Sequence, residues 1–404
     1  MTTLASSSRL NVSYIPEATF GVTPASGTVY ALRVLNESFD YSISKDMSKE
    51  INAYRSVSSM VPVSASSSGS IGGELQYAEF DRLMSSALQS AYTVYGTNGV
   101  GATFTADFTA TTITASSAPT GSSAFTGLKK GQWFRVSAGM NANDGKILRV
   151  SKTTAPTATV ITLDANTPAV VGAAVTGVAV QSSRLTNGTT QTSFTFQKEL
   201  NDVAQFFKYT GQTPSKMDVA LSQGGLSSIK FDFKGSGVDR STSTLLPSAA
   251  TPSYTYDVHS GVSGSSCVLW ENGAPLSLVK SISMAYDNSL REQNALCSLS
   301  PVGLGSGNIN LTLQAEIYFA DGSIFDRFIN NTNTELVFSS VDGYGNGYVF
   351  TIPVANISTH KLVAGGKDQD LMASVSFTAL RDASNADPTL RQLVFIDRVG
   401  VAVV

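Results

Sequence analysis

The chain has 404 residues, enough for two or three domains that each bury a core, and only 14% of the residues are charged. The net charge of −3 and the lack of dense Lys/Arg clusters argue against a nucleic-acid-binding protein, because affinity for phosphates comes largely from clustered cations. Abundant Gly, Ser, Thr and Ala favour a β-rich protein with short turns.

The first eight residues carry no apolar segment typical of a signal peptide, and the most apolar stretch, 170–180, is too short to span a bilayer. We therefore expect a soluble chain that is made in a cytoplasm. Cys267 and Cys297 lie outside any metal-ligand pattern. A disulfide between them stays open, and two buried free thiols are the favoured interpretation.

Residues 1–31 are polar and interrupted by Pro and Gly, which predicts an extended arm rather than a packed domain. Alternation over Phe39–Ile43 then predicts a half-buried strand. The stretch Ser44–Ser70 is charged at first and Ser-rich later, with no clear periodicity. Because long unstructured loops in compact domains are often functional, we expect a functional loop here.

An amphipathic helix follows Tyr77. Its apolar residues recur at helical spacing on one stripe: Phe80, Leu83, Met84, Ala87 and Leu88. The opposite face is polar, with Asp81, Arg82, Ser85 and Gln89. This pattern predicts a helix that covers a sheet and carries no chemistry.

From 97 to 183 the composition becomes rich in Ala, Thr and β-branched residues. Three short strands are predicted, at Gln132–Val136, Lys146–Val150 and Thr159–Leu163, with a hairpin turn at Asn143–Gly145. No similar block occurs in the second half of the chain. We interpret it as a small inserted β-domain that projects from the main body.

The tripeptide Phe-Asp-Arg occurs at 80–82 and again at 325–327, about 245 residues later, with similar surroundings each time. Each copy lies at a predicted helix that follows a strand, a loop and a second strand. This repeated order indicates a tandem duplication. After the insert, the first copy resumes with strands at Phe194–Phe196, Met217–Leu221 and Ile229–Phe233, and a short helix at Asp202–Phe207.

The second copy holds the clearest strand, Ile309–Phe319, whose apolar and polar residues alternate. A helix over Ile324–Asn331 follows, with Phe325, Phe328 and Ile329 expected to face inward. Later strands are predicted at Gly347–Ile352 and Ser374–Ala379. The tail from Leu390 has two interpretations, a final strand or a docking arm.

The sequence offers no constellation for catalysis. The only histidines, His259 and His360, are far apart, and neither has a metal-ligand spacing. No nucleophile elbow, phosphate-binding loop or dinucleotide motif is present. We therefore expect neither an enzyme nor a cofactor.

Several segments in the two halves are informative through their order along the chain and their surroundings, although none is a catalytic motif. They are Ile15–Pro24, Gly73–Tyr77 with Phe80–Met84, Phe206–Gly211, Asn272–Leu276, Tyr286–Arg291 and Gly365–Asp370. Together they resemble the tail tube proteins of long-tailed phages (siphoviruses), in the larger form with two tube modules per chain. The resemblance covers most of the chain outside the insert.

The resemblance implies a mainly β fold with two tandem β-sandwich or barrel modules, each with a flanking α-helix, and a small inserted β-domain. The expected organisation is an arm at 1–31, a first module at 32–96 and 184–245, the insert at 97–183, and a second module with a C-terminal arm at 246–404. Subunits would join sheet to sheet into rings, and three two-module chains would replace the six of single-module members.

Stacked rings would conduct DNA from capsid to host without binding its sequence. The implied partners are the chain itself, a tape measure protein and tail-end proteins, with assembly in the host cytoplasm, the virion tail as final location and no membrane anchor. Long loops would bridge rings through Lys45, Asp46, Lys49, Glu50, Arg55, Arg291 and Glu292. A polar lumen face would include Glu74, Gln76, Asn310, Thr312, Gln314 and Glu316.

Other interpretations stay open from the residues alone. The polar face of 310–318 is also typical of an ordinary solvated exterior. The runner-up function is a surface adhesin or carbohydrate-binding β-protein that uses an exposed aromatic such as Trp133 in the insert. A hydrolase is the third possibility, although no histidine constellation supports it.

Overall fold

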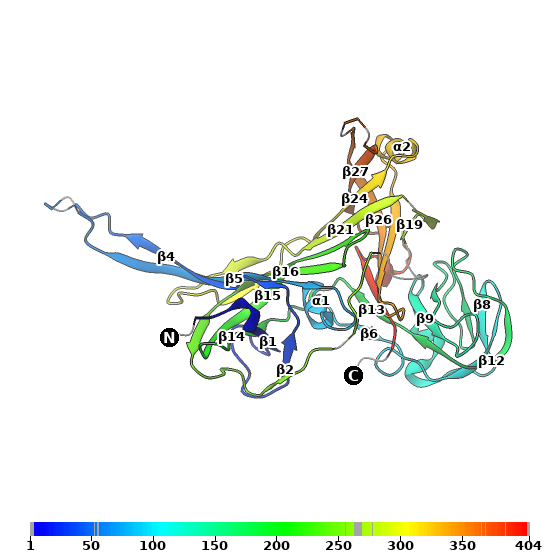
Figure 1. The fold of residues 1–404 in the computed structure, drawn as a ribbon, viewed down its shortest axis with the longest axis horizontal. Coiled ribbons are helices and arrows are strands. Elements are labelled where there is room, and N and C mark those ends of the chain that lie inside the picture. The colour runs from blue at the N-terminus through cyan, green and yellow to red at the C-terminus, as the bar shows by residue number, and fades with distance from the viewer. Residues whose placement is uncertain are drawn as a thin grey trace.

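The computed structural model describes residues 4–51, 53–54, 56–254, 256–261, 269–276, 278–364, 366–367, 369–383 and 385–401. Within these residues the chain is mainly β, with two α-helices. Figure 1 shows a central body of long strands, a thin hairpin that extends from one end and a compact lobe at the other.

A continuous antiparallel sheet of eight strands runs through the body. In spatial order its strands are β4 (Asp40–Met47), β5 (Met60–Glu74), β16 (Ser228–Gly235), β15 (Gln205–Ser222), β21 (Val279–Asp287), β24 (Asn310–Tyr318), β27 (Met372–Ala379) and β26 (Gly347–Val363). Strand β3 (Asn36–Glu37) adds to β5, and β22 (Arg291–Gln293) pairs with β23 (Gly303–Gly305) beside it. The halves of the chain therefore share one sheet.

A second layer of strands covers one face of this sheet. The long strands β15 and β26 connect the two layers, because one end of each pairs within the first layer and the other end pairs within the second. On the first half it contains β17 (Val238–Ser241), β14 (Phe194–Leu200), β1 (Leu10–Pro16), β2 (Val29–Leu32) and β18 (Ala250–Thr251). On the second half it contains β20 (Ala274–Pro275), β19 (Leu269–Glu271), β25 (Thr334–Val341), β28 (Phe395–Val399), β13 (Ser183–Thr186) and β6 (Thr93–Val94).

One hydrophobic core fills the space between the layers and continues from the first half into the second. Inward-facing residues of both layers form this core. Phe231 and Val219 belong to the eight-stranded sheet, and Phe196 and Phe350 belong to the second layer. Because side chains alternate along a strand, the same alternation leaves polar residues on the outer face of the eight-stranded sheet.

Helix α1 (Asp81–Ala87) lies against β15, and helix α2 (Ser323–Ile329) lies against β26. The predicted apolar stripe of α1 is confirmed, since all five of its residues are buried. On the polar opposite face, Asp81 and Gln89 are also buried. Asp81 accepts a hydrogen bond of 2.6 Å from the Tyr348 hydroxyl and pairs with Arg398.

The insert forms a separate lobe with its own sheet and core. Its strands, in spatial order, are β10 (Ile147–Arg149), β9 (Trp133–Ser137), β12 (Gly172–Gln181), β7 (Phe104–Phe108), β8 (Thr112–Ala115) and β11 (Val160–Thr162). The three predicted strands are present, and β9 pairs antiparallel with β10. Short 3-10 turns occur at Gly121–Ser123 and Phe125–Gly127 in this lobe, and at Ser7–Arg9 and Pro388–Leu390 elsewhere.

Three expectations from local sequence are wrong. Residues 10–16 are not a free arm, because β1 pairs with β14 and β2 and buries Tyr14. Most of the stretch Ser44–Ser70 is not a loop but part of the long hairpin β4–β5 (Figure 1). Of the residues predicted as a helix at 202–207, residues 202–204 form a turn and residues 205–207 begin β15. In each case cross-strand pairing outweighs the local pattern.

Helix α2 also departs from its prediction. Ile324 and Phe328 pack against the core, but Phe325 and Ile329 are 46% and 63% exposed. The tail contributes β28, whose five residues are all buried, so the strand interpretation holds for 395–399. Strands β6 and β13 were assigned to the first module by sequence, yet they extend the second layer of the other half.

His259 gives the fold a defined acid sensitivity. Its ring is fully buried, Nδ1 lies 3.1 Å from the Ser340 hydroxyl, and burial lowers its pKa to about 3. The unfolded chain binds this proton below about pH 6.5, whereas the folded chain resists it, so stability falls as the pH drops from about 6.5 toward 3. We expect His259→Asn to remove part of this dependence in unfolding midpoints measured between pH 7 and 5. An unchanged slope would contradict the expectation.

Candidate subunit interface

Both edges of the eight-stranded sheet are open. Within the described residues, β4 pairs only with β5, and residues 357–363 of β26 pair only with β27. Leu362 and Val363 are 45% and 44% exposed at the β26 edge. Unpaired backbone groups at such an edge are a template for another strand. The sheet can therefore be extended at both ends.

Inside the chain, the two halves are joined edge to edge by a pair of antiparallel strands. The open edges β4 and β26 would permit the same kind of pairing between two chains. Residues Lys216–Ser222 of β15 pair with Ser281–Asp287 of β21 without a break. The strand orders β4-β5-β16-β15 and β21-β24-β27-β26 have the same antiparallel pairings. The same succession of strands is thus present twice, with one junction formed and two edges left open.

The polar face of this sheet carries most of the residues predicted to line a lumen. Asn310, Gln314 and Glu316 are exposed on β24, and Thr312 is half-buried on the same face. Glu74 lies on β5 opposite Ser228. Gln76 does not belong to this set, because it is 2% exposed and accepts a hydrogen bond of 2.6 Å from Arg33.

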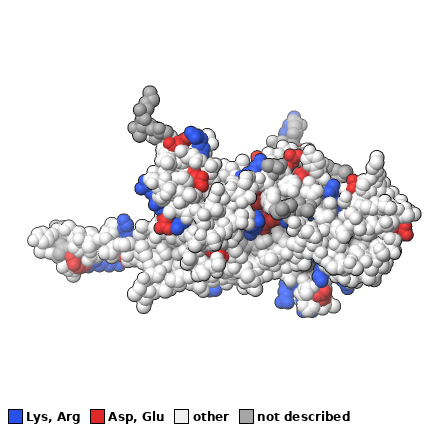
Figure 2. Space-filling model, turned by 90° about the horizontal axis from the view of Figure 1, so that it is seen from below, with Lys and Arg blue, Asp and Glu red and all other residues white. Residues whose placement is uncertain are grey.

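Other strands of the same sheet add cations that the β24 sequence lacks. Lys216 pairs with Asp218 at 2.9 Å on β15, and Lys230 pairs with Asp232 at 2.8 Å on β16. In its view of the molecule from below, Figure 2 shows charged side chains in small groups separated by broad areas without charge. Since Lys216 and Lys230 each have a carboxylate partner, these two lysines do not form a concentrated positive charge that would hold phosphates.

All the described residues that were predicted to bridge rings are exposed. Lys45 and Asp46 lie on β4, Lys49 and Glu50 lie in the connection beyond it, and Arg55 falls outside the described residues. Arg291 and Glu292 are exposed on β22, in the stretch 288–308. The stretch 288–308, which is shorter than the stretch Ser44–Ser70, folds back on the first half of the same chain. There the Ala65 amide donates a hydrogen bond of 2.8 Å to the Leu299 carbonyl.

Helix α2 presents an apolar surface that its counterpart α1 does not. The second half of the chain covers α1: Tyr348 binds Asp81, and the Asn288 side chain donates to the Ala87 carbonyl at 2.7 Å. Around α2, Phe325 and Ile329 are exposed, and the Phe325 ring lies 5.5 Å from that of His360. His360 lines a cavity of about 240 Å³ together with Tyr318, Phe319 and Ile324, among others. An exposed apolar patch of this kind is typical of a protein contact.

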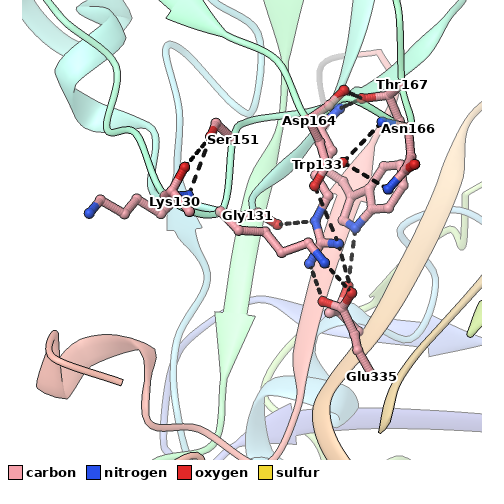
Figure 3. Close-up of polar contacts among 12 residues, drawn as sticks. Lys130, Gly131, Trp133, Ser151, Asp164, Asn166, Thr167 and Glu335 are labelled. Carbon is pink, nitrogen blue, oxygen red and sulfur yellow. Dashed lines mark hydrogen bonds and ion pairs between the residues drawn. The ribbon is translucent and has the colours of Figure 1, made fainter. Parts of the chain in front are cut away.

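The lobe is attached to the second half by buried charges. Arg149 donates to Glu335 at 2.6 and 3.2 Å and to the Gly131 carbonyl at 3.2 Å, and Lys152 lies 2.7 Å from the same carboxylate (Figure 3). Burial raises the pKa of Glu335, but the hydrogen bonds and charges of Arg149 and Lys152 outweigh it, so the pKa lies below its ordinary value. The carboxylate thus stays ionised at neutral pH.

Trp133 takes part in this attachment rather than in ligand contact. It is fully buried, its indole donates to Thr351 at 3.1 Å, and its ring lies 5.3 Å from that of Trp270. The expectation of an exposed aromatic for carbohydrate binding is therefore wrong for Trp133. Sequence reasoning missed this role because the residues that surround Trp133 come from distant segments.

The remaining candidates are the two cysteines and the side chains that could bind a metal ion. Cys297 is a free, exposed thiol, which corrects the expectation of burial, and Cys267 lies outside the described residues. Within the part of the chain that the structure describes, no group of three or more His, Cys, Asp or Glu side chains is placed to hold a metal ion. No described helix is long and apolar enough to cross a membrane.

A family model described as phage tail tube protein matches residues 7–379. The match covers nearly the whole chain, so the chain belongs to the phage tail tube protein family. A search of curated proteins finds no match. Membership identifies a structural subunit of a phage tail, which assembles with copies of itself into a tube.

Proposed function

We propose that three chains close into a ring by pairing the open edge of β26 on one chain with β4 on the next. The observation that carries this proposal is the β15–β21 junction, which already joins the two halves edge to edge. If each half is one tube module, the same junction repeated between chains gives six modules around an axis with three chains.

The stacked rings would form the tail tube of a long-tailed phage. The polar face of the eight-stranded sheet would line the lumen, and its paired or acidic charges would let DNA slide during genome delivery. The long hairpin β4–β5 would reach the next ring. A tape measure protein inside the tube and tail-end proteins at its ends are the proposed partners, with assembly in the host cytoplasm.

Native mass spectrometry and negative-stain microscopy test this proposal together. Three chains of 42.4 kDa each give a ring of about 127 kDa, and micrographs should show annular particles or tubes. Closed six-chain rings would refute the trimer while leaving the tube. Persistent monomers, in purified protein and in tail preparations alike, would refute the tube itself.

A further inference from the structure

The junction inside the chain is a template for the pairing between chains, because it shows which positions of the two strands face each other. On the polar face of the sheet, Asp218 of β15 lies opposite Ala285 of β21. On the core side, Val219 lies opposite Met284, and both are fully buried or nearly so. The equivalents of these residues on the open edges can be identified from the pairings of each half.

A shared irregularity aligns β26 with β15. The β15–β16 pairing shifts register between Pro214 and Lys216, and the β26–β27 pairing shifts between Ile357 and Thr359. Both shifts occur beside an inward phenylalanine of the partner strand, Phe233 on β16 and Phe377 on β27. Bulges mark a position in a strand pair, so Lys216 corresponds to Thr359, and Asp218 corresponds to Lys361.

The same two phenylalanines align β4 with β21. Phe377 lies opposite Leu313, which lies opposite Met284. Phe233 lies opposite Gly69, where a Cβ would meet the Phe39 backbone at 2.6 Å. Phe39 therefore corresponds to Met284, and Asp40 corresponds to Ala285. The spacing agrees, since Phe39 precedes the first Phe-Asp-Arg by as many residues as Met284 precedes the second.

From these correspondences we propose that β26 of one chain pairs antiparallel with β4 of a second copy in the register that sets Lys361 opposite Asp40. This inference rests on the proposed ring and specifies how it closes. In the same register His360 faces Tyr41, and Leu362 faces Phe39. The inner junction has Asp218 and Ala285 at the position that Lys361 and Asp40 would occupy.

Charge and exposure both support this register. Lys361 and Asp40 are exposed, and no described residue forms a salt bridge with either one. Opposite charges directly across an antiparallel pair stabilise it, and like charges destabilise it. Leu362 is 45% exposed, although its counterpart Val219 is fully buried. Leu362 is exposed because no described strand lies beside it at this edge, and pairing with β4 of a second copy would cover it.

Disulfide trapping tests the register. In a chain carrying Cys267→Ser and Cys297→Ser, the pair Asp40→Cys with Lys361→Cys should give covalent multimers under mild oxidation, seen on non-reducing gels. The matched control pairs Asp40→Cys with Thr359→Cys, two residues away on the same face. Its Cα atoms would lie about 7–8 Å apart, beyond the usual range for a disulfide, so it should give little cross-linking.

Charge exchange tests the same contact without oxidation. Asp40→Lys and Lys361→Asp should each lower the association constant of a chain-to-chain junction about twofold to fivefold, which reduces the amount of assembled protein. The variant that combines both substitutions should restore assembly. Loss without restoration in the combined variant would overturn the pairing of these two residues.

The outcomes separate the register from the ring. Cross-linking of the displaced pair instead, in rings of normal mass, would overturn the register and leave the ring. Rings with no cross-link at either pair would show that closure uses another surface. A chain that stays monomeric at all concentrations, with no cross-link, would contradict the proposed function as well as the register.

Discussion

Replacing residues 45–63 with Asn-Gly should give folded rings that no longer stack into tubes. Ser44 and Ser64 face each other across the hairpin, and Asn-Gly is a favoured two-residue hairpin turn, so the shortened strands can still join. The described residues of this stretch lie outside the core and include Ile51 and Tyr54, which are 103% and 86% exposed. Exposed apolar side chains at the end of a projecting hairpin are typical of a binding surface.

Negative-stain microscopy and native mass spectrometry check this expectation, and the unfolding temperature serves as the test of folding. A second variant, Lys49→Ala with Glu50→Ala, keeps the reach of the hairpin and removes two charges. If it still forms tubes, reach and apolar contact matter more than these charges. Tubes of normal length from the shortened chain would contradict a stacking role for the hairpin.

Asp397→Asn should lower the stability of the chain by about 3–5 kcal/mol, because it leaves a buried arginine without its partner. Asp397 is fully buried on β28 and accepts hydrogen bonds from Arg184 at 2.7 and 2.6 Å. It also accepts one from the Trp133 amide at 2.9 Å. One carboxylate therefore joins three segments: the tail strand, the strand that follows the insert, and the insert itself.

Chemical unfolding followed by tryptophan fluorescence measures this loss, since both tryptophans lie at this junction. The matched control is Asp239→Asn, whose carboxylate is 61% exposed and pairs with Lys208 at 2.9 Å. An exposed ion pair contributes less than about 1 kcal/mol, so the control should change little. Equal effects of the two substitutions would contradict the central position of Asp397.

Local patterns sufficed where burial follows a simple period. The stripe of α1 and the alternation of β24 identified buried residues because one side of each element meets the core. They failed where long-range pairing decides the outcome. Residues 202–207 have a local helical pattern, yet they turn into β15 because β14 and β17 supply partners on both sides. The alternating pattern of β24 likewise could not reveal the lysines that β15 and β16 add to the same sheet.

The sequence by itself determined the β-rich class, the duplicated pattern around Phe-Asp-Arg, the inserted block and the family resemblance, since these depend on composition, period and order along the chain. Only the tertiary structure decided which edges stay open, that 44–70 extends as a hairpin, and that Trp133 and Asp81 are buried by partners from distant segments. The physical reason is that strand pairing and ion pairing join residues far apart in the chain, and no local pattern encodes the partner.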